Sequence, residues 1–298
     1  MDEYTIGVLT NIGLFAFIAL SAYLLLVTGE MSFGQQAFFG VGAYASGILT
    51  AMYGVPLPLA AGAAMAAGAG AAVFVGLPTL RLRGLYFAMA TLAAAEMMRI
   101  LFELLRFQRR VNGELVGPDG TQGFGGIRWI FEAGVEPLDY LVLIYTMLAV
   151  VVTIFLLVER SRLGATLRAL GQDPGLAASL GIDIDRFKLG VAAAAGALAA
   201  LGGALFAHQN TYIEPRNFDI MLGVHSLAYA MIGGLGTVFG PLLGVVLDIG
   251  VLEGTRIFQG YRMIVFGGLV AVLLAFRPGG LLNEQFVHHL RTRALRKR

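Results

Sequence analysis

The sequence predicts an all-α polytopic membrane protein with about nine transmembrane helices, between eight and ten, some of them short or broken. Of its 298 residues, 57% are hydrophobic and only 13% are charged, whereas an ordinary soluble domain carries roughly 25% charged residues. The mean hydropathy is +0.77. The 41 glycines fit the same class, because membrane helices associate through small residues that let their backbones approach closely. We expect a single transmembrane domain over residues 1–298.

Hydrophobic segments of transmembrane length follow one another along the chain. A transmembrane helix needs about 20 mainly apolar residues. The first apolar segment of this length follows the acidic residues Asp2 and Glu3. The predicted spans are 6–27, 33–53, 59–80, 85–105, 141–158, 189–207, 220–232, 238–254 and 261–276. The segments that begin near residues 33, 220 and 238 could be broken or re-entrant, which is tolerated where protein or a wet cavity shields the backbone.

Two series of small residues at a spacing of four predict faces on which helices pack. One series lies in the third span, and the other begins in the glycine-rich break before the eighth span. The first consists of Gly62, Ala66 and Gly70, and the second of Gly236, Gly240 and Gly244. Small residues at this spacing let two helices approach closely in a membrane.

Basic residues in the connecting segments predict the orientation. Lysine and arginine concentrate in short cytoplasmic loops. Nine crossings with the amino terminus outside place Arg81 and Arg83, the loop at 159–188 and the basic tail at 277–298 on one side. That side is therefore expected to be the cytoplasm.

The loop at 159–188 is expected to contain two short helices. Leucines recur at helical spacing over 162–171, and a second helical piece follows over 174–180. Asp173 can cap the second piece, and Pro174 suits a first helical position.

The second piece carries Leu176, Ala177 and Leu180 before Gly181 ends it. A short helix with such a face can fit a groove on another protein, but an amphipathic helix that lies on lipid headgroups has a similar pattern. The spacing alone leaves both interpretations open.

Polar residues inside the predicted spans are candidates for a transport path, because such residues are costly in a membrane and usually face a cavity or one another. Gln35 and Gln36 could line a passage or form hydrogen bonds between helices. Glu96 is a further candidate for the path, although Arg99, three residues later, can pair with it on the same helix face.

The sequence lacks the residues that metal binding and ATP hydrolysis need. The chain has no cysteine, and its four histidines have no ligand spacing with carboxylates, so no metal site is expected. The run Gly233-Gly234-Leu235-Gly236 is not followed by the lysine and the serine or threonine of a phosphate loop. We therefore expect no ATP hydrolysis by this chain, no bound cofactor and no nucleic-acid partner.

Several stretches, in order along the chain, together resemble the permease subunits of bacterial branched-chain amino-acid ABC transporters, specifically the M-type subunit. The resemblance covers residues from about 21 to 282. The stretches are 31–44 (MSFGQQAFFGVGAY), 80–88 (LRLRGLYFA), Arg162-Leu163-Gly164 with Arg168-Ala169, Ala177-Ala178 with Gly181-Ile182, 233–241 (GGLGTVFGP) and the ending 276–281 (FRPGGL).

The resemblance implies that the loop contains a coupling helix that docks on an ATPase subunit. The residues implied are Asp173, Pro174, Gly175, Leu176, Ala177, Ala178, Leu180, Gly181 and Ile182. The family commonly has a glutamate, two alanines and then, after three further residues, a glycine. With Gly181 as that glycine, the glutamate position is Gly175, and Asp173 is the nearest acid.

The resemblance further implies an importer of leucine, isoleucine and valine in the bacterial inner membrane. Its partners would be a second, related permease, two ATP-binding subunits that hold ATP and Mg, and an extracytoplasmic substrate-binding protein. Two alternatives stay open. The same machinery could import urea, short amides or other amino acids, or the chain could be an ion-driven secondary transporter. The latter would be expected to carry an unpaired ionisable residue near the middle of the membrane.

Overall fold

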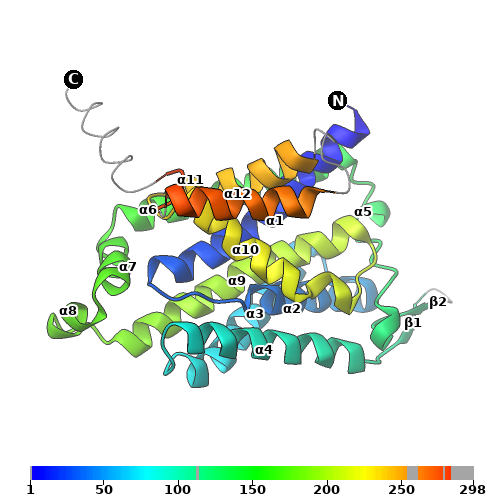
Figure 1. The fold of residues 1–298 in the computed structure, drawn as a ribbon. Coiled ribbons are helices and arrows are strands. Elements are labelled where there is room, and N and C mark those ends of the chain that lie inside the picture. Colours follow the sequence, from blue (N-terminus) through cyan, green and yellow to red (C-terminus); the bar gives the residue numbers. More distant parts are fainter. Residues whose placement is uncertain (1, 112–113, 254–260, 278, 283–298) are drawn as a thin grey trace.

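The computed structural model describes residues 2–111, 114–253, 261–277 and 279–282. Most of the predicted basic tail, residues 283–298, therefore lies outside the described residues. Within the described ranges the chain is a bundle of helices with one small β-hairpin (Figure 1).

Among the described residues, five helices are long and apolar enough to cross a membrane. They are α1 (Glu3–Val27), α3 (Leu57–Thr79), α4 (Leu85–Leu104), α6 (Pro137–Glu159) and α9 (Ile184–Asn210). Each coincides with a predicted span to within a few residues. The prediction of an all-α polytopic fold is confirmed.

The remaining predicted spans fall on shorter helices. These are α2 (Gln35–Gly47) with the π-helical η1 (Ile48–Met52), α10 (Ile220–Gly233), α11 (Phe239–Val245) with the π-helical η4 (Val246–Glu253), and α12 (Arg262–Phe276). Within the described residues none of the three segments that could be broken or re-entrant is interrupted, because α2 continues into η1, α10 is one helix and α11 continues into η4. A turn and a stretch without regular structure at 28–34, here called the extended segment, precede α2, and a turn at 234–238 precedes α11. Hydropathy gave no sign of the two π-helical segments.

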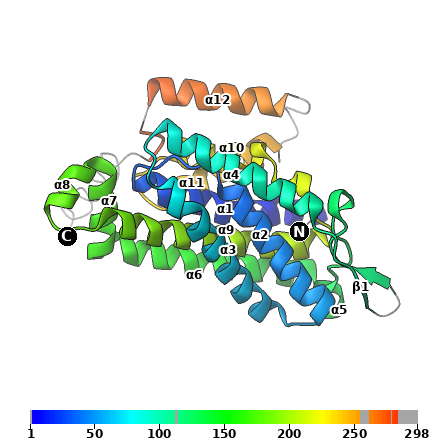
Figure 2. The ribbon, with the colours of Figure 1, turned by 90° about the horizontal axis from the view of Figure 1, so that it is seen from below.

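The connecting elements gather at opposite ends of the bundle. α7 (Arg162–Gln172) and α8 (Pro174–Ser179) lie at one end, here called the α8 end. The strands β1 (Arg109–Val111) and β2 (Glu114–Val116) lie at the other, here called the hairpin end, together with α5 (Trp129–Glu132) (Figure 1, Figure 2). The 3-10 turns η2 (Gly120–Gln122) and η3 (Pro215–Phe218) belong to loops near these strands. The antiparallel hairpin is a small departure from the predicted all-helical fold.

Helix α9 is the centre of the bundle and packs against α1, α2 and α3. At its contact with α3 the two backbones nearly touch, because a methyl group on Gly68 or Gly196 would overlap the facing helix. The predicted packing face of Gly62, Ala66 and Gly70 is therefore wrong for contacts within this chain. All three residues are exposed, and Gly68 is the α3 glycine in the contact.

Two of the three glycines in the second predicted series lie at a contact between helices. Gly240 and Gly244 lie where α11 crosses α10, and a methyl group on either would overlap backbone of the α10 side, at Gly234 and Tyr229 respectively. Gly236 precedes α11 in the turn, where its N–H donates to the carbonyl oxygen of Leu282 at 3.0 Å. Its role is therefore in the turn and not in helix packing.

Candidate functional site

Local capping explains why the loop at the α8 end folds as two helices. The Ser161 hydroxyl accepts a hydrogen bond from the Leu163 N–H at 3.2 Å, and Asp173 Oδ1 accepts one from the Leu176 N–H at 3.0 Å. Pro174 is the first residue of α8. Gly181 follows the helix with a φ of 83°, a conformation that glycine adopts without strain. The predicted helix starts and the stop at Gly181 are confirmed.

Helix α8 presents an apolar surface to its surroundings. Leu176 and Leu180 are 60% and 72% exposed. The other exposed members of the predicted coupling set are Asp173, Pro174, Gly175, Ala178 and Gly181, and Ile182 is half-buried. Ala177 is buried, so the expectation that it shares an outward face with Leu176 and Leu180 is wrong. It belongs to the contact that holds α8 on the protein.

Helix α7 is joined to the end of α1 by a close backbone contact. Leu167 and Leu170 are buried, and a methyl group at Gly171 would overlap the carbonyl oxygen of Val27. Gly29, on the other side of this contact, has a φ of 82°. The α7–α8 pair therefore rests directly on the α1 end and on the start of the extended segment at 28–34.

Two buried or half-buried carboxylates connect the α8 end with the helices behind it. Glu30 in the extended segment forms a buried ion pair with Lys188 of α9. Glu159, the last residue of α6, accepts hydrogen bonds from the Tyr23 hydroxyl at 3.0 Å and from the Val238 N–H at 2.9 Å. It thus links α1, α6 and the start of α11 at the point where the α7–α8 loop begins.

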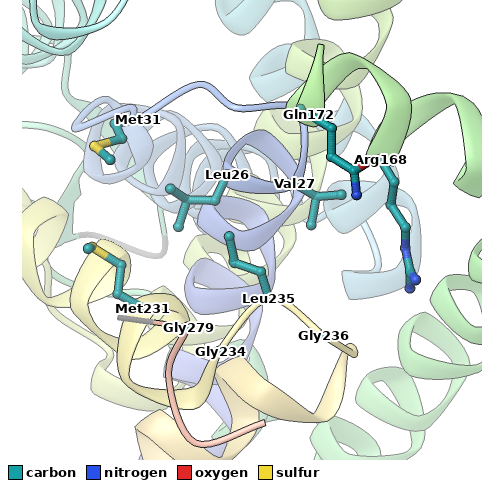
Figure 3. A pocket seen from close by; sticks show the side chains of 11 residues that line it. Leu26, Val27, Met31, Arg168, Gln172, Met231, Gly234, Leu235, Gly236 and Gly279 are labelled. Atoms are coloured by element: carbon teal, nitrogen blue, oxygen red, sulfur yellow. The ribbon is translucent and has the colours of Figure 1, made fainter. Parts of the chain in front are cut away.

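A cleft of about 360 Å³ opens between these elements (Figure 3). Leu26, Val27 and Met31 come from the α1 end and the extended segment, and Arg168, Gly171 and Gln172 come from α7. Met231, Gly234, Leu235, Gly236 and Gly279 complete the lining. The cleft therefore separates α7 from the turn between α10 and α11.

Gln35 and Gln36 lie at the start of α2 and are 0% and 1% exposed. The Ser21 hydroxyl of α1 lies 2.6 Å from both Gln35 Oε1 and the carbonyl oxygen of Ala195 in α9. A methyl group at Gly223 of α10 would overlap the Gln36 amide, so this side chain faces α10. The two neighbouring glutamines are thus both in the interior of the bundle, Gln35 beside α1 and α9 and Gln36 beside α10.

Glu96 is engaged elsewhere. Arg99 Nε donates to Glu96 Oε1 at 2.8 Å, and the same guanidinium also pairs with Glu103. The expected pairing on one face of α4 is confirmed. In the part of the chain that the structure describes, no hydrogen bond connects Glu96 with either glutamine, and its role in a path stays a prediction.

Sequence reasoning gave no role to Glu30, Glu159 or Lys188. Their partners lie 79 to 158 residues away, and a single sequence carries no signal for such pairs. Among the described residues, no group of three or more histidine or acidic side chains is arranged to hold a metal ion.

Comparisons with known proteins find that this chain is similar to permeases of branched-chain amino acid transport systems. The family described as branched-chain amino acid transport system / permease component matches residues 4–275. The high-affinity branched-chain amino acid transport system permease protein LivM of Salmonella typhimurium is 31% identical over 304 residues, which cover 93% of this chain and 68% of LivM. BraD of Pseudomonas aeruginosa, which carries the corresponding description, is 30% identical over 164 residues, or 52% of this chain and 53% of BraD. No solved structure shows a significant match.

Proposed function

The chain belongs to the family of branched-chain amino acid transport system permease components, and we propose from this premise that it forms part of the membrane passage of an ABC importer for leucine, isoleucine and valine. The observation that carries the proposal is the match along 93% of the chain to a relative described as a high-affinity permease of this kind. A second, related permease would complete the passage. The apolar interior of the bundle suits aliphatic cargo.

ATP hydrolysis belongs to partner subunits in this proposal. Two ATP-binding chains, which hold ATP and Mg, dock at the α8 end. Leu176 of α8 and Leu180, the C-cap residue of α8, enter a groove on one of them. The exposed apolar face of α8 supports this assignment, because a short helix with two apolar anchors is a common ligand of such grooves. Gly175 replaces the acidic residue of the family pattern, so the contact is mainly apolar.

Movement of α8 reaches the membrane helices through the contacts behind it. Closure of the ATPase pair displaces α8 and α7, and the Gly171 contact carries the displacement to the α1 end. The hydrogen bonds of Glu159 transmit it to Val238 at the start of α11. Closely packed helices respond to such a displacement by discrete shifts between two arrangements. The result is alternation between a passage open at the hairpin end and one open at the α8 end.

The orientation of the chain in the membrane follows from the docking of the ATPase subunits at the α8 end. The α8 end faces the cytoplasm of a bacterial cell, and the amino terminus and the hairpin end face outward, where a substrate-binding protein delivers the cargo. The arginines at 81, 83, 160 and 162 all lie in connections predicted to face inward, as expected for cytoplasmic loops.

Reconstitution in lipid vesicles tests the proposal. Vesicles that contain this chain, its partner permease and the ATPase subunits are supplied with loaded binding protein, and uptake of labelled leucine is measured. Uptake should require ATP, the ATPase subunits and the binding protein, and it should stop with a catalytically inactive ATPase. Excess isoleucine or valine should compete, whereas urea and short amides should not. Uptake by this chain alone, driven by an ion gradient, would overturn the proposal.

A further inference from the structure

Unpaired polar atoms in the protein interior are concentrated on one helix. Four buried side-chain atoms have no hydrogen-bond partner among the described residues, and all four belong to α2: Gln35 Nε2, Gln36 Oε1, Tyr44 OH and Ser46 Oγ. None of these side chains is more than 3% exposed. Buried polar groups without partners are rare because each loses its bonds to water without replacement. Their concentration on α2 calls for a ligand that this helix meets.

Two of these groups lie on the same face of α2. Gln36, Gly40 and Tyr44 follow one another at intervals of four residues, which places them in a row along the helix. Gln36 faces Gly223 of α10. At Gly40 a methyl group would lie 2.6 Å from the Phe102 ring and 3.1 Å from the Phe218 ring. The row therefore follows a seam between α2, α4 and α10.

Aromatic rings close this seam toward the hairpin end. The Tyr44 ring stacks on Phe102 with centroids 4.6 Å apart, and Phe218 meets both rings at 6.0 Å. Phe124 adds a fourth ring, 6.3 Å from Tyr44. Phe124 and Phe218 come from the loops at the hairpin end and not from long helices, and both are fully buried.

The glutamines lie well inside the bundle. Gln35 shares the Ser21 hydroxyl with Ala195, which is 11 residues into α9, or about 17 Å along the helix. The extended segment at 28–34 runs back from the α1 end before α2 begins (Figure 1). Gly34 at the N-cap offers no side-chain cap. The first N–H groups of a helix carry partial positive charge and favour a carboxylate.

We propose that the Gln36–Gly40–Tyr44 face of α2 lines the translocation path, and that the Gln35 and Gln36 amides at the α2 N-terminus bind the charged groups of an α-amino acid. The inference rests on the proposed function. An amide offers both a donor and an acceptor, so Gln35 Nε2 donates to the substrate carboxylate and Gln36 Oε1 accepts from its ammonium group. Tyr44 OH provides a second contact beside the aromatic rings, and the aliphatic side chain of the substrate packs against those rings.

Two substitutions remove the unpaired atoms of Gln36 and Tyr44 with little change in the shape of either side chain. Gln36→Met and Tyr44→Phe are each placed in the complete transporter, and uptake is measured with saturating loaded binding protein. We expect the maximal rate of uptake to fall by roughly tenfold or more, the typical effect of losing a hydrogen bond to a charged or polar ligand. Thermal stability should be unchanged or higher, because the lost atom had no partner to begin with.

Tyr140→Phe is the matched control. The Tyr140 hydroxyl is also buried, but it donates to the carbonyl oxygen of Leu205 at 2.7 Å. Its loss should lower thermal stability and leave the rate of uptake within about twofold of wild type.

The outcomes separate this inference from the proposed function. If the wild-type transporter imports leucine with ATP and both α2 variants import it at the same rate, the α2 site is wrong and the function stands. A fall in uptake with an equal fall in stability or in ATPase co-purification would also overturn the α2 site, since it would show a structural role. Failure of wild-type import would instead overturn the proposed function.

Discussion

Lys188 and Glu30 form a buried ion pair between α9 and the segment that follows α1. Lys188→Met leaves the Glu30 carboxylate without its counter-charge, and removal of one partner from a buried pair costs about 3–5 kcal/mol. The double variant that adds Glu30→Leu should recover most of this loss. Thermal denaturation in detergent of the two single variants and the double variant measures the coupling.

The pair of Arg186 and Asp183 is a control for this experiment. These side chains approach to 3.0 Å but are 89% and 54% exposed, so Arg186→Met should change stability by well under 1 kcal/mol. Equal effects of Arg186→Met and Lys188→Met would show that burial of the Lys188 pair has no energetic importance.

Removal of the Glu159 side chain should affect helices other than α6, to which Glu159 belongs. Glu159→Ala deletes the acceptor of two hydrogen bonds, each worth about 1.5–3 kcal/mol when one partner is charged. Because those bonds connect α6 with α1 and α11, we expect ATP-driven uptake to fall more than ATPase co-purification. Uptake and co-purification are compared with those of Glu132→Ala, an exposed acid on α5. Identical behaviour of the two variants would exclude a relay through Glu159.

At the scale of single residues, the sequence predicts pairs within one helix and misses pairs between helices. Glu96 and Arg99 are three residues apart, so helical spacing alone brings them together. Glu30 and Lys188 are 158 residues apart, and only the packing of α9 on α1 brings them into contact. The unpaired Tyr44 hydroxyl could not be anticipated either, because burial and the lack of a partner are properties of the folded chain.

At the scale of elements, α8 is the part of the protein that should respond most selectively to a surface change. Leu180→Asp places a charge on its exposed apolar face, which should reduce ATPase co-purification by at least tenfold. Stability should change by no more than about 0.5 kcal/mol, as for other surface positions. Leu115→Asp, at an exposed leucine of β2 at the opposite end, should affect neither quantity.

Ala177 distinguishes the two faces of α8. It is buried, so Ala177→Asp places a charge in the contact that holds α8 and should lower thermal stability as well as co-purification. If Leu180→Asp leaves co-purification and uptake intact, α8 is an interfacial helix that lies on lipid headgroups, and the docking assignment is wrong.

The boundaries of α8 were predictable because each has a local cause in the sequence. Asp173 supplies the cap, Pro174 the first turn and Gly181 the positive φ after the end. The face that α8 turns outward was not predictable, because α8 (Pro174–Ser179) is too short for periodicity to identify which side is buried. The inward position of Ala177 depends on the placement of α7 and α9.

At the scale of the whole molecule, hydropathy predicted the order and approximate bounds of the membrane helices. It succeeded because each span is a continuous apolar stretch bounded by glycine, proline or charge. It gave no information on which glycines meet, since both faces of α3 are rich in small residues. Gly68 contacts α9, whereas a methyl group on Gly62 or Gly70 would meet no atom of another described element within 4 Å. The central position of α9 likewise emerged only from the packed structure.

The proposed orientation yields the most direct prediction for the intact protein. The chain contains no cysteine, so single cysteines can be introduced without a prior removal of native ones. Leu180→Cys lies at the C-cap of α8 and Leu115→Cys on β2, at exposed positions at opposite ends of the bundle. In right-side-out membrane vesicles, a membrane-impermeant thiol reagent should label the Leu115→Cys variant and spare the Leu180→Cys variant. In inside-out vesicles the pattern should reverse, because the α8 end would then face the reagent. Mass spectrometry of this chain identifies the labelled site, and detergent permeabilisation, which should expose both, controls for reactivity. Labelling of Leu180→Cys from the outside would reverse the orientation and remove α8 from the reach of a cytoplasmic ATPase.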